Sequence, residues 1–486
     1  MSFVFGGNEL HSELRKSAPL LDAYLRYFES EKIPFTIPGH KQKAHRLDEG
    51  LGIVVDSDIP LYGGLDEIKL TNGTLQKAEE LAARLWGADY ARFSTGGSTH
   101  ANQAMILALG KPGDKVAVSR TAHRSILSGL VLSGLEPIWL TPEINEATGI
   151  PMGIPLAELE RVLSQNPIAI LLTEPGYLGT ISDLPALIAR AHEYSIPVII
   201  DAAWGGHFGF NDNLPRHALQ LGADALITSI HKALPGYSAS ALLLAQGKFL
   251  DIARIEQSFE TTHTTSPAGA PMASIDACRA LLETRGAELT GRLLENVTSF
   301  KAAVQANFDF PVFLNTENFP EGRFDPVKIV LRANSLGLSG LDLEAQLQKA
   351  NIRVEMADQD TVVFLATLAD DEIEFKKLAS ALVPILKSLQ GPPRSAQTSL
   401  SWSVVPEIGI STRDAYFAET EFVSASDAVG RISADLIAPY PPGVAVLAPG
   451  EVITEQIVSG LAKLREAGVR IAYASDPTLT TYRVTT

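Results

Sequence analysis

The chain has 486 residues, of which 45% are hydrophobic and 20% are charged, and its formal net charge is −16 at pH 7. A chain of this length and composition can bury several hydrophobic cores, so two to four folding units are expected and general disorder is not. The acidic balance argues against nucleic acid as the main partner, because phosphates are bound through clustered lysine and arginine. It also gives no sign of docking to an anionic membrane.

Cysteine content and the N-terminal residues predict where the protein resides. Cys278 is the only cysteine, so neither an intrachain disulfide nor a thiolate-rich metal site can form, and no metal is expected. The opening residues, MSFVFGGNEL, lack a basic segment followed by a long apolar run. No stretch of the chain approaches the roughly 20 apolar residues of a membrane-spanning helix. A soluble protein of the reducing cytoplasm is therefore expected.

The first 62 residues are predicted to form an N-terminal arm without a hydrophobic core of its own. The spacing of apolar residues predicts one amphipathic helix from about Leu10 to Glu31. The irregular segment IPFTIPGHKQ and a stretch containing Gly and Asp follow this helix.

Residues 63–290 are predicted to form a large α/β domain. Between about 75 and 245, short β-rich apolar runs alternate with helix-length segments, a pattern typical of a mostly parallel sheet covered by helices. Several runs are apolar without alternation, as expected for strands buried on both faces. Ligands of such folds bind beyond the carboxyl ends of the strands, so the residues after each run are candidate site residues. The runs are YARFS, KVAVS, PIWLT, AILLT, PVIID, ALITS and ASALLLA.

Two smaller units are predicted after the large domain. Residues 291–390 are predicted to form a small α/β domain, with a long helix around GAELTGRLLENVTSFKAAVQAN and strands in PVKIVLRA and TVVFLATL. Residues 391–486 begin with GPPRSAQTS, which has the composition of a linker. They continue into a C-terminal domain that contains the Pro-rich PYPPGVAVLAPGE.

Two predicted strand ends carry an amine and a carboxylate that together indicate pyridoxal phosphate chemistry. Lys232 follows ALITS, and burial would shift this lysine toward the neutral amine that forms Schiff bases. Asp201 ends PVIID, where its carboxylate could keep a pyridine nitrogen protonated so that the ring accepts electrons. Taken alone, the lysine could be a solvated loop residue and the aspartate a turn cap. Both groups at neighbouring strand ends favour the cofactor.

Two more strand ends supply groups that suit the same cofactor. After YARFS, Gly97, Ser98 and Thr99 can present backbone N–H groups and hydroxyls at a helix N-terminus, as a phosphate site requires. After KVAVS, His123 can stack on a planar ring and handle a proton. Each of these residues could also be an ordinary helix cap or a buried hydrogen-bonded side chain. Their position along the predicted sheet supports the functional interpretation.

The sequence resembles the prokaryotic ornithine/lysine/arginine decarboxylase family, which has the aspartate-aminotransferase-like fold (fold type I) and depends on pyridoxal phosphate. General aminotransferases lack the last two of the motifs that carry the resemblance. The motifs extend over most of the chain: IPGHKQ, GGSTHANQA, AHRSILSGL, TEPGYLGTISDL, DAAWGGHF, SIHKALPG, HTTSPAGAPMASIDACR, SGLDLEAQLQKANIRVEM and GRISADLIAPYPPGVAVLAPGE.

The resemblance implies a role for each candidate site residue. Lys232 would carry the cofactor as a Schiff base, His123 would stack on its ring, and Asp201 would pair with the pyridine nitrogen. Trp204 would lie close to the cofactor and Ser98 would be one of its phosphate ligands. The full set of cofactor contacts implied by the resemblance adds Gly97, Thr99, Ala203, Ser229 and His231.

The resemblance also implies contacts that involve a second subunit and the substrate. Thr264 or Thr265 would reach the phosphate of a neighbouring subunit, so a homodimer or a larger homo-oligomer is expected, with the active site at the subunit interface. Glu355 is a candidate to bind the distal cation of the substrate. A solvated surface glutamate is an equally good interpretation of Glu355.

The chain departs from the common family pattern at three places. Residues 201–204 read Asp-Ala-Ala-Trp where many short members have Asp-Glu-Ala-His. Residues 238–240 read Ser-Ala-Ser where Thr-Gln-Ser is common. The chain is also too short to include the receiver-like domain of the long members. These differences leave the cofactor in place but leave the identity of the substrate open.

The predicted reaction is decarboxylation of a basic amino acid, which is arginine, lysine or ornithine, to its amine and CO2. Lys232 or His123 would supply or relay the proton that completes the amine. Short members of the family are often arginine decarboxylases of polyamine metabolism, which favours arginine by analogy. A transaminase or lyase reaction of the same fold, and a regulatory relative that binds the cofactor without catalysis, are the alternatives. A regulatory relative would have no need of both Lys232 and Asp201.

Overall fold

The structure is a computed structural model that describes residues 9–30, 32–33, 36–59, 61, 65, 73–440 and 443–486. Three expectations lie outside these residues: those on the first eight residues, on most of the Gly- and Asp-containing stretch after residue 60, and on the domain division between residues 62 and 63. The same is true of two prolines of the Pro-rich motif, Pro441 and Pro442. Within the described ranges, each helix is too short or too polar to cross a bilayer.

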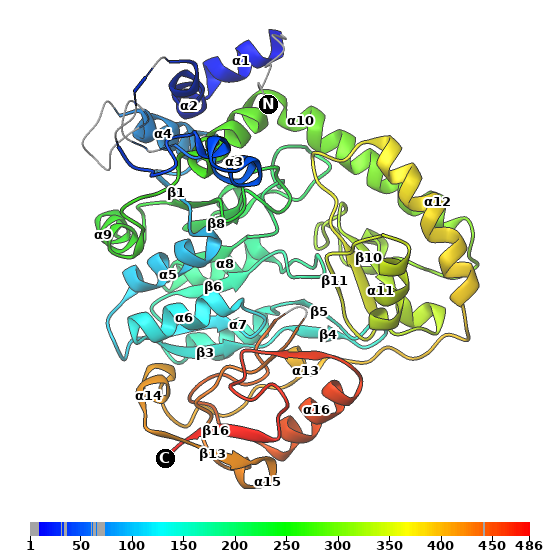
Figure 1. Cartoon of the computed structure of the whole chain (residues 1–486). Coiled ribbons are helices and arrows are strands. Elements are labelled where there is room, and N and C mark those ends of the chain that lie inside the picture. The colour runs from blue at the N-terminus through cyan, green and yellow to red at the C-terminus, as the bar shows by residue number, and fades with distance from the viewer. Residues whose placement is uncertain are drawn as a thin grey trace.

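A seven-stranded sheet forms the centre of the large domain (Figure 1). Its strand order is β1-β9-β8-β7-β6-β2-β3, and β9 alone runs antiparallel to its neighbours. Each of the seven apolar runs forms one of these strands, so the predicted mostly parallel sheet is confirmed. The strands are β1 (Tyr90–Ser94), β2 (Lys115–Ser119), β3 (Glu136–Leu140), β6 (Ile170–Thr173), β7 (Val198–Asp201), β8 (Ala225–Ser229) and β9 (Ala241–Ala245).

Helices cover both faces of the sheet because successive strand residues point to opposite sides. In β7, Val198 and Ile200 belong to one buried hydrophobic cluster and Ile199 belongs to the other. The first cluster lies under α4 (Thr74–Trp86), α7 (Leu156–Leu163) and α8 (Leu184–Glu193), and the second under α5 (Gly97–Leu109), α6 (Arg124–Ser133) and α9 (Ile252–Thr262).

The N-terminal arm differs from its prediction. The single helix expected from Leu10 to Glu31 is two helices, α1 (Glu9–Ser17) and α2 (Pro19–Glu29). Pro19 has no backbone N–H and disfavours helical geometry in the preceding residue, and Ala18 accordingly has φ −121° and ψ 84°. Glu31 lies outside the described residues. A short 3-10 helix (Ala44–Arg46) and α3 (Glu49–Val55) follow.

The arm packs on the large domain through buried contacts. Leu20 is fully buried in the first hydrophobic cluster, and Ile59 is buried with it. The carboxylate of Asp276, on the long helix α10 (Gly269–Gln305), accepts a hydrogen bond from the backbone N–H of Leu20 at 2.8 Å. The described part of the arm therefore shares the core of the large domain.

A 37-residue helix, α10 (Gly269–Gln305), connects the large domain to the small one. The division expected between residues 290 and 291 falls inside this continuous helix. The small domain has an antiparallel sheet of β10 (Ile329–Arg332), β12 (Thr361–Phe364) and β11 (Met356–Ala357). Two helices, α11 (Gly340–Lys349) and α12 (Glu372–Leu389), cover this sheet, and α12 lies beside α10 (Figure 1).

The C-terminal unit has its own buried cluster and follows a segment, residues 390–399, that is neither helix nor strand. Arg394 fixes this segment, because its guanidinium donates to the carbonyl of Leu338 at 2.9 Å and pairs with Asp360 at 2.5 Å. The elements are α13 (Leu400–Ser403), α14 (Thr412–Phe417), β13 (Thr420–Ser424), α15 (Ala425–Ala428), β14 (Ala438–Tyr440), α16 (Glu455–Glu466), β15 (Arg470–Ala472) and β16 (Thr481–Thr485).

The C-terminal unit docks against β3 and α6, at the opposite end of the molecule from α1 and α2 (Figure 1). Arg120 and Glu451 form a bidentate ion pair with distances of 2.5 and 3.1 Å, and each side chain is 1% exposed. Arg413 donates to the carbonyl of Leu132 at the end of α6. A short hairpin, β4 (Glu143–Asn145) and β5 (Ile150–Gly153), adds a contact, since Trp402 Nε1 donates to the carbonyl of Gly149 at 3.2 Å.

Candidate active site

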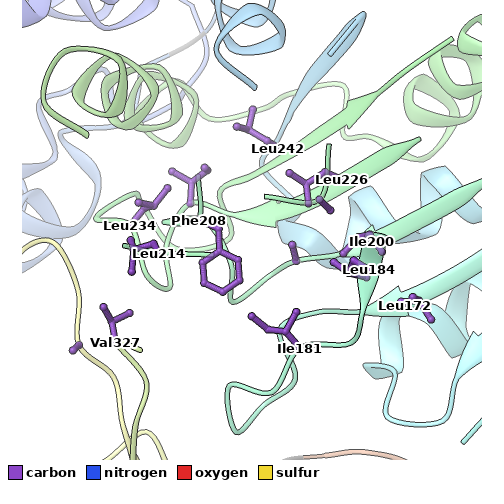
Figure 2. Close-up of a cluster of buried hydrophobic side chains, with 14 of the residues drawn as sticks. Leu172, Ile181, Leu184, Ile200, Phe208, Leu214, Leu226, Leu234, Leu242 and Val327 are labelled. Carbon is purple, nitrogen blue, oxygen red and sulfur yellow. The ribbon is translucent and has the colours of Figure 1, made fainter. Parts of the chain in front are cut away.

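The residues predicted to form the site meet at the carboxyl ends of the strands. Asp201 is the last residue of β7, and Lys232 lies in the loop that follows β8. His123 is the N-cap of α6, after β2. A buried hydrophobic cluster that includes Phe208 and Leu234 supports the loops after β7 and β8 (Figure 2). Since this packing fixes both loops, the amine and the carboxylate are held at one edge of the sheet.

Asp201 is a buried carboxylate without a direct ion pair among the described residues. It is 4% exposed. Its Oδ2 accepts a hydrogen bond from Asn102 Nδ2 at 2.9 Å, and its Oδ1 accepts one from the backbone N–H of Ala203 at 3.2 Å. Burial raises the pKa of Asp201, while the charge of Lys232 and these two hydrogen bonds oppose the rise. The carboxylate is thus suited to hold a cationic ring nitrogen.

Lys232 lies against the ring of Trp204. Its Nζ is 4.3 Å from the ring centroid. Burial lowers the pKa of Lys232, and the negative charges of Asp201 and Glu355 partly oppose that change. A lysine whose pKa is lowered has more neutral amine at pH 7, which is the form that attacks a carbonyl carbon.

His123 is neutral at pH 7 and held in one orientation. Burial lowers its pKa to about 4, and the charges of Lys232 and Arg124 add to the effect. Its Nδ1 accepts a hydrogen bond from the backbone N–H of Ser125 at 3.2 Å and lies 2.9 Å from the Ser125 hydroxyl. Because Nδ1 accepts, the ring proton resides on Nε2.

Asn102 and Ser125 connect Asp201 to His123, and sequence reasoning missed both. Asn102 Nδ2 donates to the Ser125 hydroxyl at 3.0 Å as well as to Asp201. Asn102 lies one helical turn after Ser98, so the two residues share a face of α5, and this spacing is the signal that could have found it. The pair explains how a carboxylate on β7 and an imidazole on α6 keep a fixed relative position.

Small polar residues gather at the start of α5. Gly97 has φ +71°, a conformation that side chains rarely adopt. The hydroxyl oxygens of Ser98 and Ser229 are 2.8 Å apart although the two residues are distant in sequence. His231 Nδ1 donates to the carbonyl of Ser240 at 3.0 Å. Thr99 is exposed beside them. The structure therefore brings Ser229 to the N-terminus of α5, which carries Gly97, Ser98 and Thr99.

Trp204 has a buried N–H group that lacks a hydrogen-bond partner among the described residues. Its side chain also contacts a residue that sequence reasoning missed, since Lys328 Nζ is 3.9 Å from the ring centroid. Tyr177, in the turn after β6, has a second buried polar atom without a partner, its hydroxyl. Burial, together with the charge of Asp201, raises the pKa of Tyr177. Unpaired buried polar groups at one sheet edge indicate a ligand site.

The remaining predicted residues lie away from this cluster. Thr264 and Thr265 are exposed and follow α9, where they line a separate cavity with Arg92. Neither a hydrogen bond nor an ion pair among the described residues joins them to Lys232. Glu355 is exposed just before β11, and its negative charge partly opposes the lowering of the pKa that burial causes in both Lys232 and Lys328. The small domain therefore places one carboxylate at the rim of the site.

Comparisons with known proteins agree on one family. Residues 18–374 match the model of the Orn/Lys/Arg decarboxylase major domain, and residues 397–471 match that of the Orn/Lys/Arg decarboxylase C-terminal domain. An arginine decarboxylase of Bacillus subtilis is 31% identical over 96% of this chain and 97% of its own length. Lysine decarboxylase A from Pseudomonas aeruginosa has a TM-score of 0.80 at 21% identity, covering 98% of this chain and 81% of that chain.

A second solved structure, described as SPT with PLP, shares part of the fold. Its TM-score is 0.52 at 15% identity, and the match covers 65% of this chain and 77% of that chain. The fold class predicted for this chain, an aspartate-aminotransferase-like α/β large domain with further small domains, is thereby confirmed.

Proposed function

Because the chain belongs to the Orn/Lys/Arg decarboxylase family, whose members decarboxylate basic amino acids, we propose that it does so with pyridoxal phosphate as cofactor and arginine as preferred substrate. The observation that carries the proposal is the convergence of Lys232 and Asp201 at one sheet edge. The amine has a lowered pKa and the carboxylate is buried without an ion pair among the described residues. These are the two groups that the cofactor requires.

The residues present fit the cofactor. The buried N–H of Trp204 lacks a partner among the described residues, so it is available to an oxygen atom on the cofactor ring. Lys232 would hold the cofactor covalently, Asp201 would face the ring nitrogen and His123 would stack on the ring. When bound, the protonated ring supplies the electron sink that accepts the electron pair left by CO2. The phosphate would be held by Ser98, Thr99, Ser229 and His231.

Asp201 and His123 would orient the reacting groups rather than exchange protons with the substrate. Asn102 and the backbone of Ala203 hold the Asp201 carboxylate at fixed distances, so its charge stays opposite the ring nitrogen. His123 is neutral and its proton is on Nε2, which makes it a poor acid at pH 7. Lys232, whose amine would be free once the substrate is bound, would be the better donor for the proton that completes the product.

A three-substrate assay tests the function. The purified protein with added pyridoxal phosphate is incubated separately with arginine, lysine and ornithine, and CO2 and the corresponding amine are measured. We expect equal amounts of CO2 and amine, fastest with arginine. Formation of a keto acid without CO2 would favour a transaminase of the same fold. Absence of turnover, with the cofactor bound, would favour a regulatory relative. Lys232→Ala should abolish the borohydride-reducible absorbance band of the bound cofactor.

Glu355 is proposed to attract the distal cation of the substrate. Its carboxylate is exposed at the rim of the site. Its negative charge partly opposes the lowering of the pKa that burial causes in Lys232 and Lys328. Glu355→Gln should raise KM for the amino acid and Ki for the product amine by similar factors, since both molecules keep the distal cation. Glu317, an exposed glutamate on the same domain, supplies the control variant Glu317→Gln.

A homodimer is proposed in which Thr264 or Thr265 reaches the phosphate in the partner subunit. Both threonines are exposed and form neither a hydrogen bond nor an ion pair with the described residues around Lys232. Light scattering should give twice the chain mass or a multiple of it. Mixing inactive Lys232→Ala chains with weakened Thr264→Ala, Thr265→Ala chains should restore activity, because a hybrid dimer has one intact site. No recovery on mixing would contradict a shared site.

A further inference from the structure

A second buried lysine, Lys328, faces the same aromatic ring as Lys232. Lys328 directly precedes β10 of the small domain and is 7% exposed. Its Nζ is 3.9 Å from the ring centroid of Trp204, and Lys232 Nζ is 4.3 Å from that centroid. Two ammonium groups from different domains therefore lie against a single side chain. The family motifs identified in the sequence do not include Lys328.

The charge of Lys328 has no direct partner among the residues that the structure describes. It forms neither an ion pair nor a hydrogen bond there. The closest acidic residue in sequence, Asp325, is bound to His207 at 3.1 Å. Burial lowers the pKa of Lys328 to about 8, although the negative charges of Asp325 and Glu355 partly oppose this lowering. An ammonium buried in this way is costly unless an anion binds it.

The stem of Lys328 is held in place by the turn after β6. A Cβ atom built on Gly179 would be 2.9 Å from the Cβ of Lys328, so the backbone of this turn lies directly against the stem. The backbone N–H of Asp325 donates to the carbonyl of Gly179 at 2.8 Å. Next to Lys328, Val327 faces the cluster that includes Phe208 (Figure 2). The base of the Lys328 side chain is thus held in place, with its ammonium over the ring of Trp204.

The anion is not expected to be the phosphate of the cofactor. The residues suited to bind phosphate gather at the N-terminus of α5, where the hydroxyls of Ser98 and Ser229 meet. Lys328 instead approaches Trp204 from the small domain. A basic amino acid has one anionic group, its α-carboxylate, and this group must lie beside the reacting carbon.

We propose that Lys328 binds the α-carboxylate of the amino acid substrate. The inference rests on the proposed function and adds a binding residue to it. The ion pair exists in the bound substrate and weakens as the carbon–carbon bond breaks, because the carboxylate leaves as neutral CO2. An interaction of this kind lowers KM without raising kcat. The cationic amine product has no group for Lys328 to bind, which favours its release.

Comparison of the substrate with its own product tests the proposal. Lys328→Met should raise KM for arginine by about 10- to 100-fold, the range expected for a charge-assisted hydrogen bond. We expect kcat to change by less than about threefold. We also expect Ki for the product amine, and its dissociation constant measured by calorimetry, to stay the same or decrease. Lys328→Arg keeps the charge and should recover part of the affinity for arginine.

Lys301→Met is the matched control. Lys301 is a second buried lysine of this part of the chain, 9% exposed and with a pKa lowered to about 8 by burial, but its Nζ contacts the carbonyl of Pro326 at 3.4 Å. Its replacement should leave the ratio of KM for arginine to Ki for the amine unchanged.

The outcomes separate this inference from the proposed function. Equal increases in KM and Ki for Lys328→Met would mean that Lys328 only shapes the pocket, and the inference would be wrong. Loss of the visible absorbance band would make Lys328 a cofactor ligand instead, which also overturns it. Wild-type protein that releases no CO2 from any basic amino acid would refute the proposed function. If Lys328→Met does not fold, the comparison of Lys328→Arg with Lys328→Gln decides, since only the former keeps a cation.

Discussion

Replacing Asn102 with alanine is the sharpest test of how the site is organised. The side chain of Asn102 donates one hydrogen bond to Asp201 Oδ2 at 2.9 Å and another to the Ser125 hydroxyl at 3.0 Å. Without it, the buried carboxylate keeps a single backbone donor, the N–H of Ala203 at 3.2 Å. Ser125 also loses the hydrogen bond from Asn102, which is its link to Asp201.

The size of the effect follows from the lost donor. A hydrogen bond to a charged group is worth about 1.5–3 kcal/mol, so holding a cationic ring nitrogen should become about 10- to 100-fold less favourable. Burial already raises the pKa of Asp201, and removing a donor raises it further. More of the protein then carries a protonated, uncharged Asp201 as the pH falls. The loss of activity should therefore be larger at pH 6 than at pH 8.

Three measurements check this prediction. Absorbance titration gives the affinity for pyridoxal phosphate, kcat and KM are determined at both pH values, and circular dichroism verifies the fold. Gln103→Ala is the matched control, because Gln103 is the next residue of α5 and its amide donates to the Ser128 hydroxyl at 2.8 Å, away from Asp201. Cofactor affinity and rates within about twofold of wild type for Asn102→Ala would refute the reasoning.

Three further predictions concern stability. Glu451→Gln should lower the free energy of unfolding by about 3–5 kcal/mol in urea titrations, because it leaves Arg120 buried without its partner charge, whereas the exposed Glu466→Gln should change it little. Gly97→Ala should cost about 1–2 kcal/mol from its φ of +71° and weaken cofactor binding measured by absorbance. Burial lowers the pKa of His217 to about 4, so the unfolded chain takes up a proton below about pH 6.5 that the folded chain does not. Stability should fall from pH 7 to pH 5, and less so in His217→Asn; equal slopes would contradict this.

The strands could be predicted from the sequence because each is a short apolar run. All seven runs form the central sheet, and Lys232, Asp201 and His123 lie at or just after the carboxyl ends of its strands. The direction of β9 could not be predicted, because periodicity is the same for parallel and antiparallel strands. The break before Pro19 could have been predicted, since proline ends helical geometry in the residue before it.

Residues whose role depends on three-dimensional packing, and not on a strand end or a motif, were harder to predict. Asn102 was within reach, because it lies one helical turn after Ser98 on the same helix. Lys328 was not, because its position depends on how the small domain packs against the loop that carries Trp204. The length of α10 was also hidden, because Gly286 and Gly291 lie at the expected domain division and glycine often marks the end of a helix, yet the helix continues through both.

The balance of charges in the site gives a reason why a basic amino acid is bound and its amine released. Lys232 and Lys328 lie inside, with Asp201 buried beside the first and Glu355 at the rim. On the proposed roles, the cofactor nitrogen pairs with Asp201, which leaves Lys328 without an anion and Glu355 without a cation. An amino acid with a cationic tail supplies both missing charges at once. After CO2 has left, the cationic tail of the amine still pairs with Glu355, but the amine has no anion for Lys328. The unpaired buried ammonium of Lys328 therefore favours replacement of the amine by a new substrate molecule.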